Sequence, residues 1–178
     1  MALDWLLCSY RLPREPSRLR LAVWRRLRRI GAVMLHDGLW TLPADAKTRE
    51  DFEWLAEEIE ERGGTVLLWA SRSLDSAQDA AVAERFRAEA AERYAGLAEG
   101  AEQLSRVARR RRLKAGSLEL ALQRLRALER ALRLERRRDF FRASGRAAAE
   151  AAIRGAIEAV RARIQACAGG RRRNAVGD

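Results

Sequence analysis

The pattern of apolar and polar residues separates an early part of short apolar runs and amphipathic segments from a later part that is amphipathic throughout. Residues 5–12 form a short apolar run that Pro13 ends, and we expect a buried strand there. Ser17 is a suitable N-cap for the next segment, in which apolar residues recur at helical spacing up to Gly31. The chain therefore begins with a strand followed by a helix.

The next four segments continue this alternation. Short strands are expected at 32–35 and 39–42, on either side of the turn-forming pair Asp37-Gly38. An acidic amphipathic helix is expected at 50–62, and a strand rich in β-formers at 65–70. The order β-α-β-β-α-β predicts an α+β fold, a ferredoxin-like sandwich with two helices on one face of an antiparallel sheet.

From residue 75 onward alanine, arginine, glutamate and leucine dominate, and no strand pattern remains. We expect helices at 75–98, 101–114, 117–138 and 144–168. The third contains an apolar stripe of Leu118, Leu122, Leu125, Leu128 and Leu132, which packs on neighbouring helices or, as the alternative, forms a dimer seam. The chain is thus divided into a ferredoxin-like sandwich at 1–74, an all-helical extension of about four helices packed on it at 75–170, and a disordered basic tail at 171–178.

The charge of the chain is strongly positive and unevenly distributed. Lys and Arg number 36 against 25 Asp and Glu, a formal net charge of +11, and Lys47 and Lys114 are the only lysines. Residues 1–31 carry +6, residues 32–70 carry −6, residues 71–102 carry −3 and residues 103–178 carry +14. Arginine binds phosphate and other oxyanions through two parallel hydrogen bonds, so this distribution favours contact with nucleic acid or another anionic partner.

Two groups of basic residues stand out as candidate anion-binding sites. The first helix places arginines opposite its apolar stripe, and the run at 109–112 projects all round the end of a helix. The candidate residues are Arg14, Arg18, Arg25, Arg28, Arg29, Arg109, Arg110, Arg111, Arg112 and Lys114. A second run, Arg133 with 136–138, is equally well explained by helical ion pairs with neighbouring acids.

The sequence shows no pattern typical of an active site, metal site or cofactor site. His36 is the only histidine, and Cys8 and Cys167 are far apart, so neither a Cys-His pair nor a zinc motif can be assembled from local spacing. The apolar runs are too short to cross a bilayer, and the N-terminus lacks the pattern of a signal peptide. We expect a cytoplasmic, non-enzymatic protein without a cofactor.

Several segments are distinctive enough to suggest a family. They are Trp5-Leu6-Leu7-Cys8-Ser9-Tyr10-Arg11-Leu12-Pro13-Arg14-Glu15-Pro16-Ser17-Arg18, Ala22-Val23-Trp24-Arg25-Arg26-Leu27, residues 35–43, Gly63-Gly64, Phe86-Arg87, Glu92-Arg93-Tyr94 and Arg138-Asp139-Phe140-Phe141. Together they resemble the N-terminal domain of the chromate-resistance regulator ChrB. The family signature falls on Arg14, Pro16, Ser17, Arg18, Trp24 and Arg25.

The resemblance implies a ferredoxin-like core with a helical extension, related to the middle domain of the phenylacetate repressor PaaX and to the CRISPR-associated adaptation nuclease. It implies a transcription regulator of a chromate-efflux operon that chromate releases from DNA. Longer members carry a second, C-terminal ChrB domain that this chain lacks, so a separate partner could supply it. The nuclease has a metal-binding Asp near the end of its first strand, where this chain reads Ser9-Tyr10-Arg11, and Asp4 precedes the expected strand.

Three functional hypotheses follow. The first is a ChrB-like DNA-binding regulator or accessory protein of chromate resistance that contacts phosphates through its arginines. The second is a non-enzymatic interaction or homodimerisation module that uses the leucine stripe and the acidic helix, its basic charge being only solvated. The third is direct binding of chromate or a related oxyanion by Arg14, Arg18 and Arg25.

Overall fold

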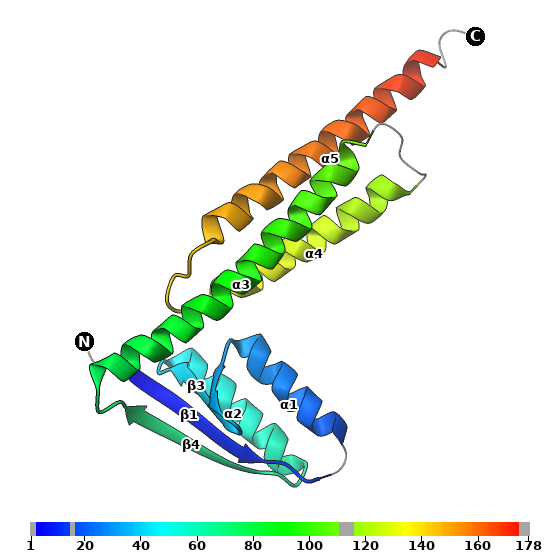
Figure 1. The fold of residues 1–178 in the computed structure, drawn as a ribbon. Helices are drawn as coiled ribbons and strands as arrows, with labels where there is room; N and C mark the ends of the chain where they lie inside the picture. Colours follow the sequence, from blue (N-terminus) through cyan, green and yellow to red (C-terminus); the bar gives the residue numbers. More distant parts are fainter. Residues whose placement is uncertain (1–2, 15–16, 111–115, 175–178) are drawn as a thin grey trace. The chain divides into compact units, whose positions relative to one another are not determined.

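The order of helices and strands confirms the predicted α+β fold (Figure 1). The computed structural model describes residues 3–14, 17–110 and 116–174. The elements are β1 (Asp4–Arg11), α1 (Ser17–Ile30), β2 (Val33–His36), β3 (Leu39–Pro43), α2 (Ala46–Glu61), β4 (Thr65–Arg72), α3 (Ser76–Ala108), α4 (Ser117–Arg138) and α5 (Arg146–Asn174). They form two compact units, residues 1–86 and 87–178, so residues 76–86 of α3 group with the sheet.

The first unit contains a four-stranded sheet in the order β2-β3-β1-β4, with every neighbouring pair antiparallel. This is the predicted ferredoxin-like arrangement, in which the two split β-α-β units interleave. Helices α1 and α2 lie together against one face of the sheet (Figure 1). Strands β2 and β4 are therefore the two edges.

The core of the first unit lies between this face of the sheet and the two helices. Leu6 pairs with Leu42 and Cys8 with Trp40, so these four side chains share a face, and all are buried. The helices contribute the apolar positions that recur every three or four residues, Leu19, Val23 and Leu27 from α1 and Phe52, Leu55 and Ile59 from α2. The residues on one face of β1 and β3 and those on the inner sides of α1 and α2 thus form one core.

Helix α2 begins at Ala46, four residues before the predicted start. Asp45 is its N-cap and accepts a hydrogen bond from the backbone N–H of Thr48, whose hydroxyl accepts one from the backbone N–H of Asp45. This reciprocal capping satisfies two backbone donors. Strand β1 likewise begins at Asp4 rather than after it, and the Asp4 carboxylate forms an ion pair with Arg72 of β4.

The first turns of α3 pack on the sheet face opposite α1 and α2. The Phe86 ring is stacked on that of Trp5, with the ring centroids 5.9 Å apart. Asp79 is buried and accepts hydrogen bonds from the Trp5 indole at 2.7 Å, from the Leu3 N–H at 3.0 Å and from the Ser73 hydroxyl at 2.7 Å. Its carboxylate therefore anchors β1 to the beginning of α3.

The second unit is helical, and helix α3 corrects one prediction. Residues 76–108 form a single helix instead of two helices that break at Gly100. A Cβ at Gly100 would lie 3.3 Å from Leu128 Cδ2, so the missing side chain makes room for α4 instead of ending α3. Helix α4 matches the predicted 117–138. Helix α5 continues to Asn174, so the backbone of residues 171–174, predicted to be disordered, is helical.

The leucine stripe of α4 lies in the core of the second unit. Leu125 is buried among Leu104 of α3 and Ile153 and Val160 of α5, and the other leucines of the stripe pack against this cluster. The neighbouring helices of the same chain thus bury the stripe, which was the first of the two predicted explanations. In the described part of the chain no helix combines the length and apolar character that a membrane span needs.

Candidate nucleic-acid interface

The outer face of α1 is the most concentrated basic surface of the first unit. The helix contains six arginines and no acidic residue. Since Leu19, Val23 and Leu27 fix its buried side, the helical period places Arg18, Arg25 and Arg29 on the other side, where all three are exposed. The structure therefore brings together three of the predicted candidate residues on one helix face.

Within the part of the chain that the structure describes, no acidic side chain neutralises these arginines. Among the residues that the structure describes, Arg18, Arg25 and Arg29 make no ion pair and no side-chain hydrogen bond, whereas Arg28 is half-buried and does have a partner. Leu21 and Trp24 lie exposed between them, and Trp24 retains 47% of its surface. The face thus combines free guanidinium groups with an accessible indole.

A hollow of about 440 Å³ between α1 and α2 extends this surface. It is lined by Arg18, Leu19, Ala22 and Arg62. Arg62 pairs with Glu58 at 3.2 Å, while Arg18 has no such partner in the described part of the chain. The groove therefore keeps an excess of positive charge. Arg14, which precedes α1, is also exposed.

The basic run at 109–112 differs from its prediction. Helix α3 ends at Ala108, so Arg109 and Arg110 follow the helix instead of surrounding its last turn, and both are exposed. The carbonyl oxygen of Arg110 accepts a hydrogen bond from Arg163 of α5 at 3.2 Å. Arg111, Arg112 and Lys114 lie outside the described residues.

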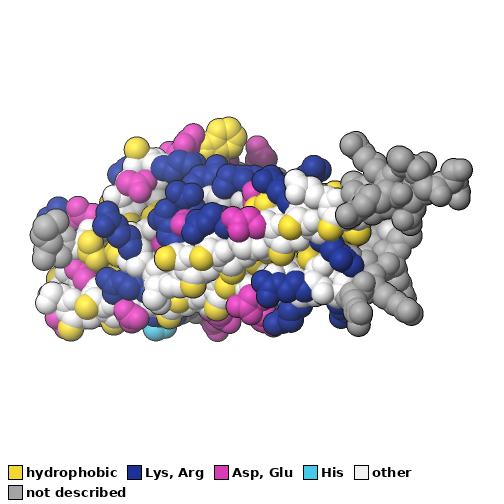
Figure 2. All heavy atoms as spheres, turned by 90° about the horizontal axis from the view of Figure 1, so that it is seen from above, with side chains coloured by type: hydrophobic (Ala, Val, Ile, Leu, Met, Phe, Trp, Pro, Cys, Tyr) yellow, Lys and Arg dark blue, Asp and Glu magenta, His cyan; other side chains and the backbone are white. Residues whose placement is uncertain are grey.

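A second basic hollow lies in the helical unit, at the end of α4 and the beginning of α5. Its volume is about 390 Å³, and its lining consists of Arg133, Arg136, Arg137 and Arg146. Glu150 lies 3.7 Å from Arg136 and 3.1 Å from Arg146 and neutralises part of this charge. Figure 2 shows one face of the molecule, with Lys and Arg side chains in groups among acidic ones.

The sequence did not connect Arg146 to the arginines of α4. Residues 139–145 separate the two helices, and only the packing of α5 against α4 brings Arg146 to the hollow. No periodicity crosses such a loop. The first-turn position of Arg146 was visible in the sequence, but its neighbours were not.

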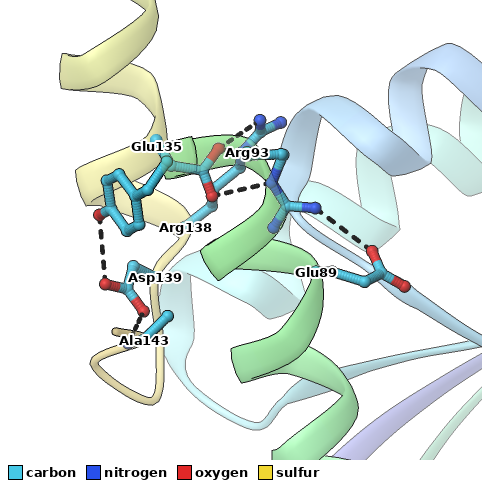
Figure 3. Close-up of polar contacts among 7 residues, drawn as sticks. Glu89, Arg93, Glu135, Arg138, Asp139 and Ala143 are labelled. Carbon is cyan, nitrogen blue, oxygen red and sulfur yellow. Dashed lines mark hydrogen bonds and ion pairs between the residues drawn. The ribbon is translucent and has the colours of Figure 1, made fainter. Parts of the chain in front are cut away.

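Arg138, at the end of this second run, forms a helical ion pair with Glu135, which is one of the two explanations that the sequence offered for the run. Its guanidinium donates to Glu135 from Nε at 2.7 Å, and Arg93 of α3 donates to the same carboxylate at 2.8 Å (Figure 3). Glu89 in turn accepts from Arg93 at 3.2 Å. Glu135 is almost fully buried, so the two arginines supply the compensation that its charge requires.

Asp139 continues this network into the loop before α5. It accepts a hydrogen bond from the Tyr94 hydroxyl at 3.2 Å and another from the Ala143 N–H at 2.8 Å (Figure 3). Burial, followed by the charge of Asp139, raises the pKa of Tyr94. The polar groups of Arg93, Tyr94, Arg138 and Asp139 therefore link α3, α4 and the loop before α5.

The other side chains that the sequence considered for chemistry, those of Cys8 and His36, lie in different places of the first unit. Cys8 is buried in the sheet, and burial raises the pKa of its thiol to about 12. His36 is exposed at the end of β2, beside a cavity of about 380 Å³. Within residues 3–14, 17–110 and 116–174, no three His, Cys, Asp or Glu side chains gather as metal ligands.

The sequence of this chain matches the model of one protein family. The model described as "Protein ChrB, N-terminal" matches residues 20–165. The chain is also similar to protein ChrB of Cupriavidus metallidurans, with 32% identity over 76 residues, which make up 43% of this chain and 24% of that protein. The similarity thus spans about a quarter of the relative's length. No solved structure matches.

Proposed function

This chain belongs to the family of the N-terminal part of protein ChrB, and on that premise we propose that it is a DNA-binding regulator or accessory protein of chromate resistance. In this proposal it contacts DNA phosphates through arginine side chains and carries out no reaction. Chromate is the effector that weakens the DNA contact.

The observation that carries the proposal is the outer face of α1. Ordinary solvated helices pair basic with acidic residues three or four positions apart. Helix α1 contains no acidic residue, and within the described chain Arg18, Arg25 and Arg29 stay unpaired. A row of unpaired, exposed guanidinium groups is what binding to a polyanion requires, because each one can replace the counterions of a phosphate.

The arginines of α4 support the proposal less strongly. Arg136 is near Glu150, and Arg138 is committed to Glu135. Arg133 and Arg137 have no partner in the described residues, so the hollow they line is a secondary contact surface. We therefore rank α1 first and the α4 hollow second.

Phosphate contacts position a protein on DNA and do not read its sequence. The half-exposed Trp24 lies among the α1 arginines, where it can pack against sugars or bases. In the proposal, operator preference comes from such contacts or from DNA shape.

The test is fluorescence-anisotropy binding to the chain's own upstream duplex and to a scrambled duplex, over a salt series and with or without chromate. We expect affinity to fall steeply with salt. Arg25→Glu should weaken binding to both duplexes and lower the salt slope by about 1, since one phosphate contact is lost.

Lys47→Glu is the matched control, because it makes the same charge change on the acidic helix α2. It should alter the affinity much less than Arg25→Glu does. Equal effects of the two variants would mean that only net charge matters, and the assignment of the α1 face would be wrong. Absence of binding at low salt would refute DNA binding altogether.

A further inference from the structure

Strand β4 is an unprotected edge of the sheet. It is eight residues long, and in the described chain its ladder partner is β1 alone. Residues 65–71, Thr-Val-Leu-Leu-Trp-Ala-Ser, contain neither a charge nor a proline. Edge strands of monomeric proteins are usually short or carry a charge, a proline or a bulge that prevents pairing with another chain. None of these devices interrupts this run.

The side chains of β4 are also unusually exposed for their chemistry. Leu67 and Trp69 retain 60% and 59% of their surface, and they share the sheet face opposite α1 and α2. Leu68, on the helix-covered face, is still 39% exposed. An exposed apolar strand at a free edge is a surface suited to a partner strand.

We propose that the occupant is a second copy of this chain, whose β4 pairs antiparallel with the first to give one continuous eight-stranded sheet. This inference does not depend on the DNA-binding proposal. A two-fold axis perpendicular to the sheet makes the interface isologous, so each copy presents the same edge to the other.

The sequence of β4 fixes the register of this pairing. The uncharged run 65–71 is symmetric about Leu68, so an axis at Leu68 places every one of its residues opposite another uncharged residue. Leu67 of one copy then lies beside Trp69 of the other, on the same face. An axis at Trp69 would instead bring the Arg72 charges over the apolar part of the strand.

Charges on α2 select a second copy of this chain over an unrelated strand. Arg49 and Glu53 line a hollow with Leu68, Trp69 and Ala70, so this side of α2 flanks β4. Glu60 falls on the same side, eleven positions after Arg49. Under the proposed axis the two α2 helices run antiparallel, and Arg49 of each copy comes to face Glu60 of the other.

These charges are available for such pairing. Arg49 and Glu60 are exposed, and among the described residues neither side chain has an ion-pair or hydrogen-bond partner. The point midway between them along α2 lies within one turn of Glu53, which lines the same hollow as Leu68. The helix and the strand thus imply the same two-fold axis.

The first experiment measures the mass of the full chain by light scattering and sedimentation over a concentration series. The wild-type chain should have twice its chain mass at micromolar concentration. Trp69→Lys should give a monomer, because it places two charges in the apolar centre of the interface. Trp54→Lys is the matched control, since Trp54 is 61% exposed on the solvent side of α2, and it should stay dimeric.

The second experiment reverses charges, which tests the axis without touching the strand. Arg49→Glu and Glu60→Arg should each weaken the dimer by about 5-fold or more, because each change affects two symmetric ion pairs. The double variant should restore the wild-type dissociation constant. A monomeric wild type, a dimer that survives Trp69→Lys, or two charge reversals that add instead of compensating would each overturn the proposal.

Discussion

Arg93 of α3 donates from Nε to the carboxylate of Glu135 of α4 across 2.8 Å, and that carboxylate is only 1% exposed. A buried charge is costly unless it is paired and hydrogen-bonded. Here the pairing links two helices through residues that are 42 positions apart in the sequence. Arg93 and Glu135 therefore contribute to the packing of α3 against α4.

Replacing Glu135 should destabilise the helical unit strongly. In Glu135→Ala the guanidinium of Arg138 loses the carboxylate of Glu135, while Arg93 keeps its ion pair with Glu89. We expect a loss of about 3 kcal/mol in the free energy of unfolding, because a largely buried charge loses its compensation. Chemical denaturation followed by circular dichroism measures it. Glu102→Ala removes an exposed carboxylate, 3.8 Å from Arg106, and should cost less than about 1 kcal/mol. Similar losses in both variants would show that the network contributes no more than a surface ion pair.

The fold of the first unit could be predicted from the sequence because its signals are local. A short apolar run that Pro13 ends marks β1, the turn-forming pair Asp37-Gly38 marks the hairpin of β2 and β3, and helical periodicity marks α1. The early start of α2 was missed, because the capping box at Asp45 and Thr48 precedes the apolar pattern on which the prediction relied. Gly100 misled for the opposite reason. Glycine often ends helices, but here it lies inside one, where a Cβ would crowd the side chain of Leu128.

The candidate site was predictable in part. Helical geometry alone places Arg18, Arg25, Arg28 and Arg29 on one face of α1. Arg18, Arg25 and Arg29 are exposed there, whereas Arg28 is half-buried and has a partner. The ion pair of Arg138 with Glu135 is an i,i+3 pair within α4, of the helical kind that the sequence offered as one explanation of this run. The hollow that Arg146 completes and the bond from Arg93 to Glu135 depend on contacts between helices. Such contacts join residues across loops, and a single sequence carries no periodic signal for them.

Gly64 should be the glycine least tolerant of substitution. A Cβ there would lie 2.5 Å from Ile59 Cγ2 and 2.8 Å from the carbonyl oxygen of Arg11, at the point where β4 begins beside β1. Gly64→Ala should lower the free energy of unfolding by about 1–3 kcal/mol, because backbone and core must shift.

Gly96 provides the opposite control within α3. A Cβ at this position would meet nothing within 4 Å, so Gly96→Ala should stabilise the protein by about 0.5–1 kcal/mol through helix propensity. Urea titrations of both variants give the two signs. If Gly64→Ala were also neutral or stabilising, the close approach of β1 and Ile59 to Gly64 would not exist in solution.

Asp79 should make the first unit sensitive to acid. Hydrogen bonds from the Trp5 indole, the Leu3 N–H and the Ser73 hydroxyl hold the pKa of Asp79 below its ordinary value of 3.8. Since the folded pKa is the lower one, its stabilising contribution is present above about pH 4 and is lost as pH falls through the folded pKa.

The free energy of unfolding, followed by tryptophan fluorescence, should therefore drop between about pH 5 and pH 2 in the wild type. Asp79→Asn should be less stable at neutral pH and show a shallower drop. Asp4→Asn separates the contribution of the neighbouring carboxylate, whose pKa the hydrogen bond from Arg72 also lowers. An unchanged pH profile in Asp79→Asn would contradict the role assigned to these hydrogen bonds.

The two cysteines should differ greatly in reactivity. Cys8 is fully buried, and burial raises the pKa of its thiol from 9.0 to about 12, so its thiolate fraction at pH 8 falls about 1000-fold. Cys167 is only half-buried on α5. Treatment of the native protein with N-ethylmaleimide, followed by peptide mass spectrometry, should show Cys167 modified at least about 100-fold faster than Cys8.

Guanidinium chloride provides the control for this comparison, because unfolding exposes both thiols and should equalise their rates. Destabilising variants connect the measurement to the rest of the fold. Gly64→Ala should speed modification of Cys8 in proportion to its loss of stability, because the thiol reacts when the sheet opens. Glu135→Ala acts in the other compact unit. If it accelerates Cys8 as much as Gly64→Ala does, then the two units unfold as one cooperative body; if Cys8 stays protected, the ferredoxin-like unit keeps its structure independently of the helices.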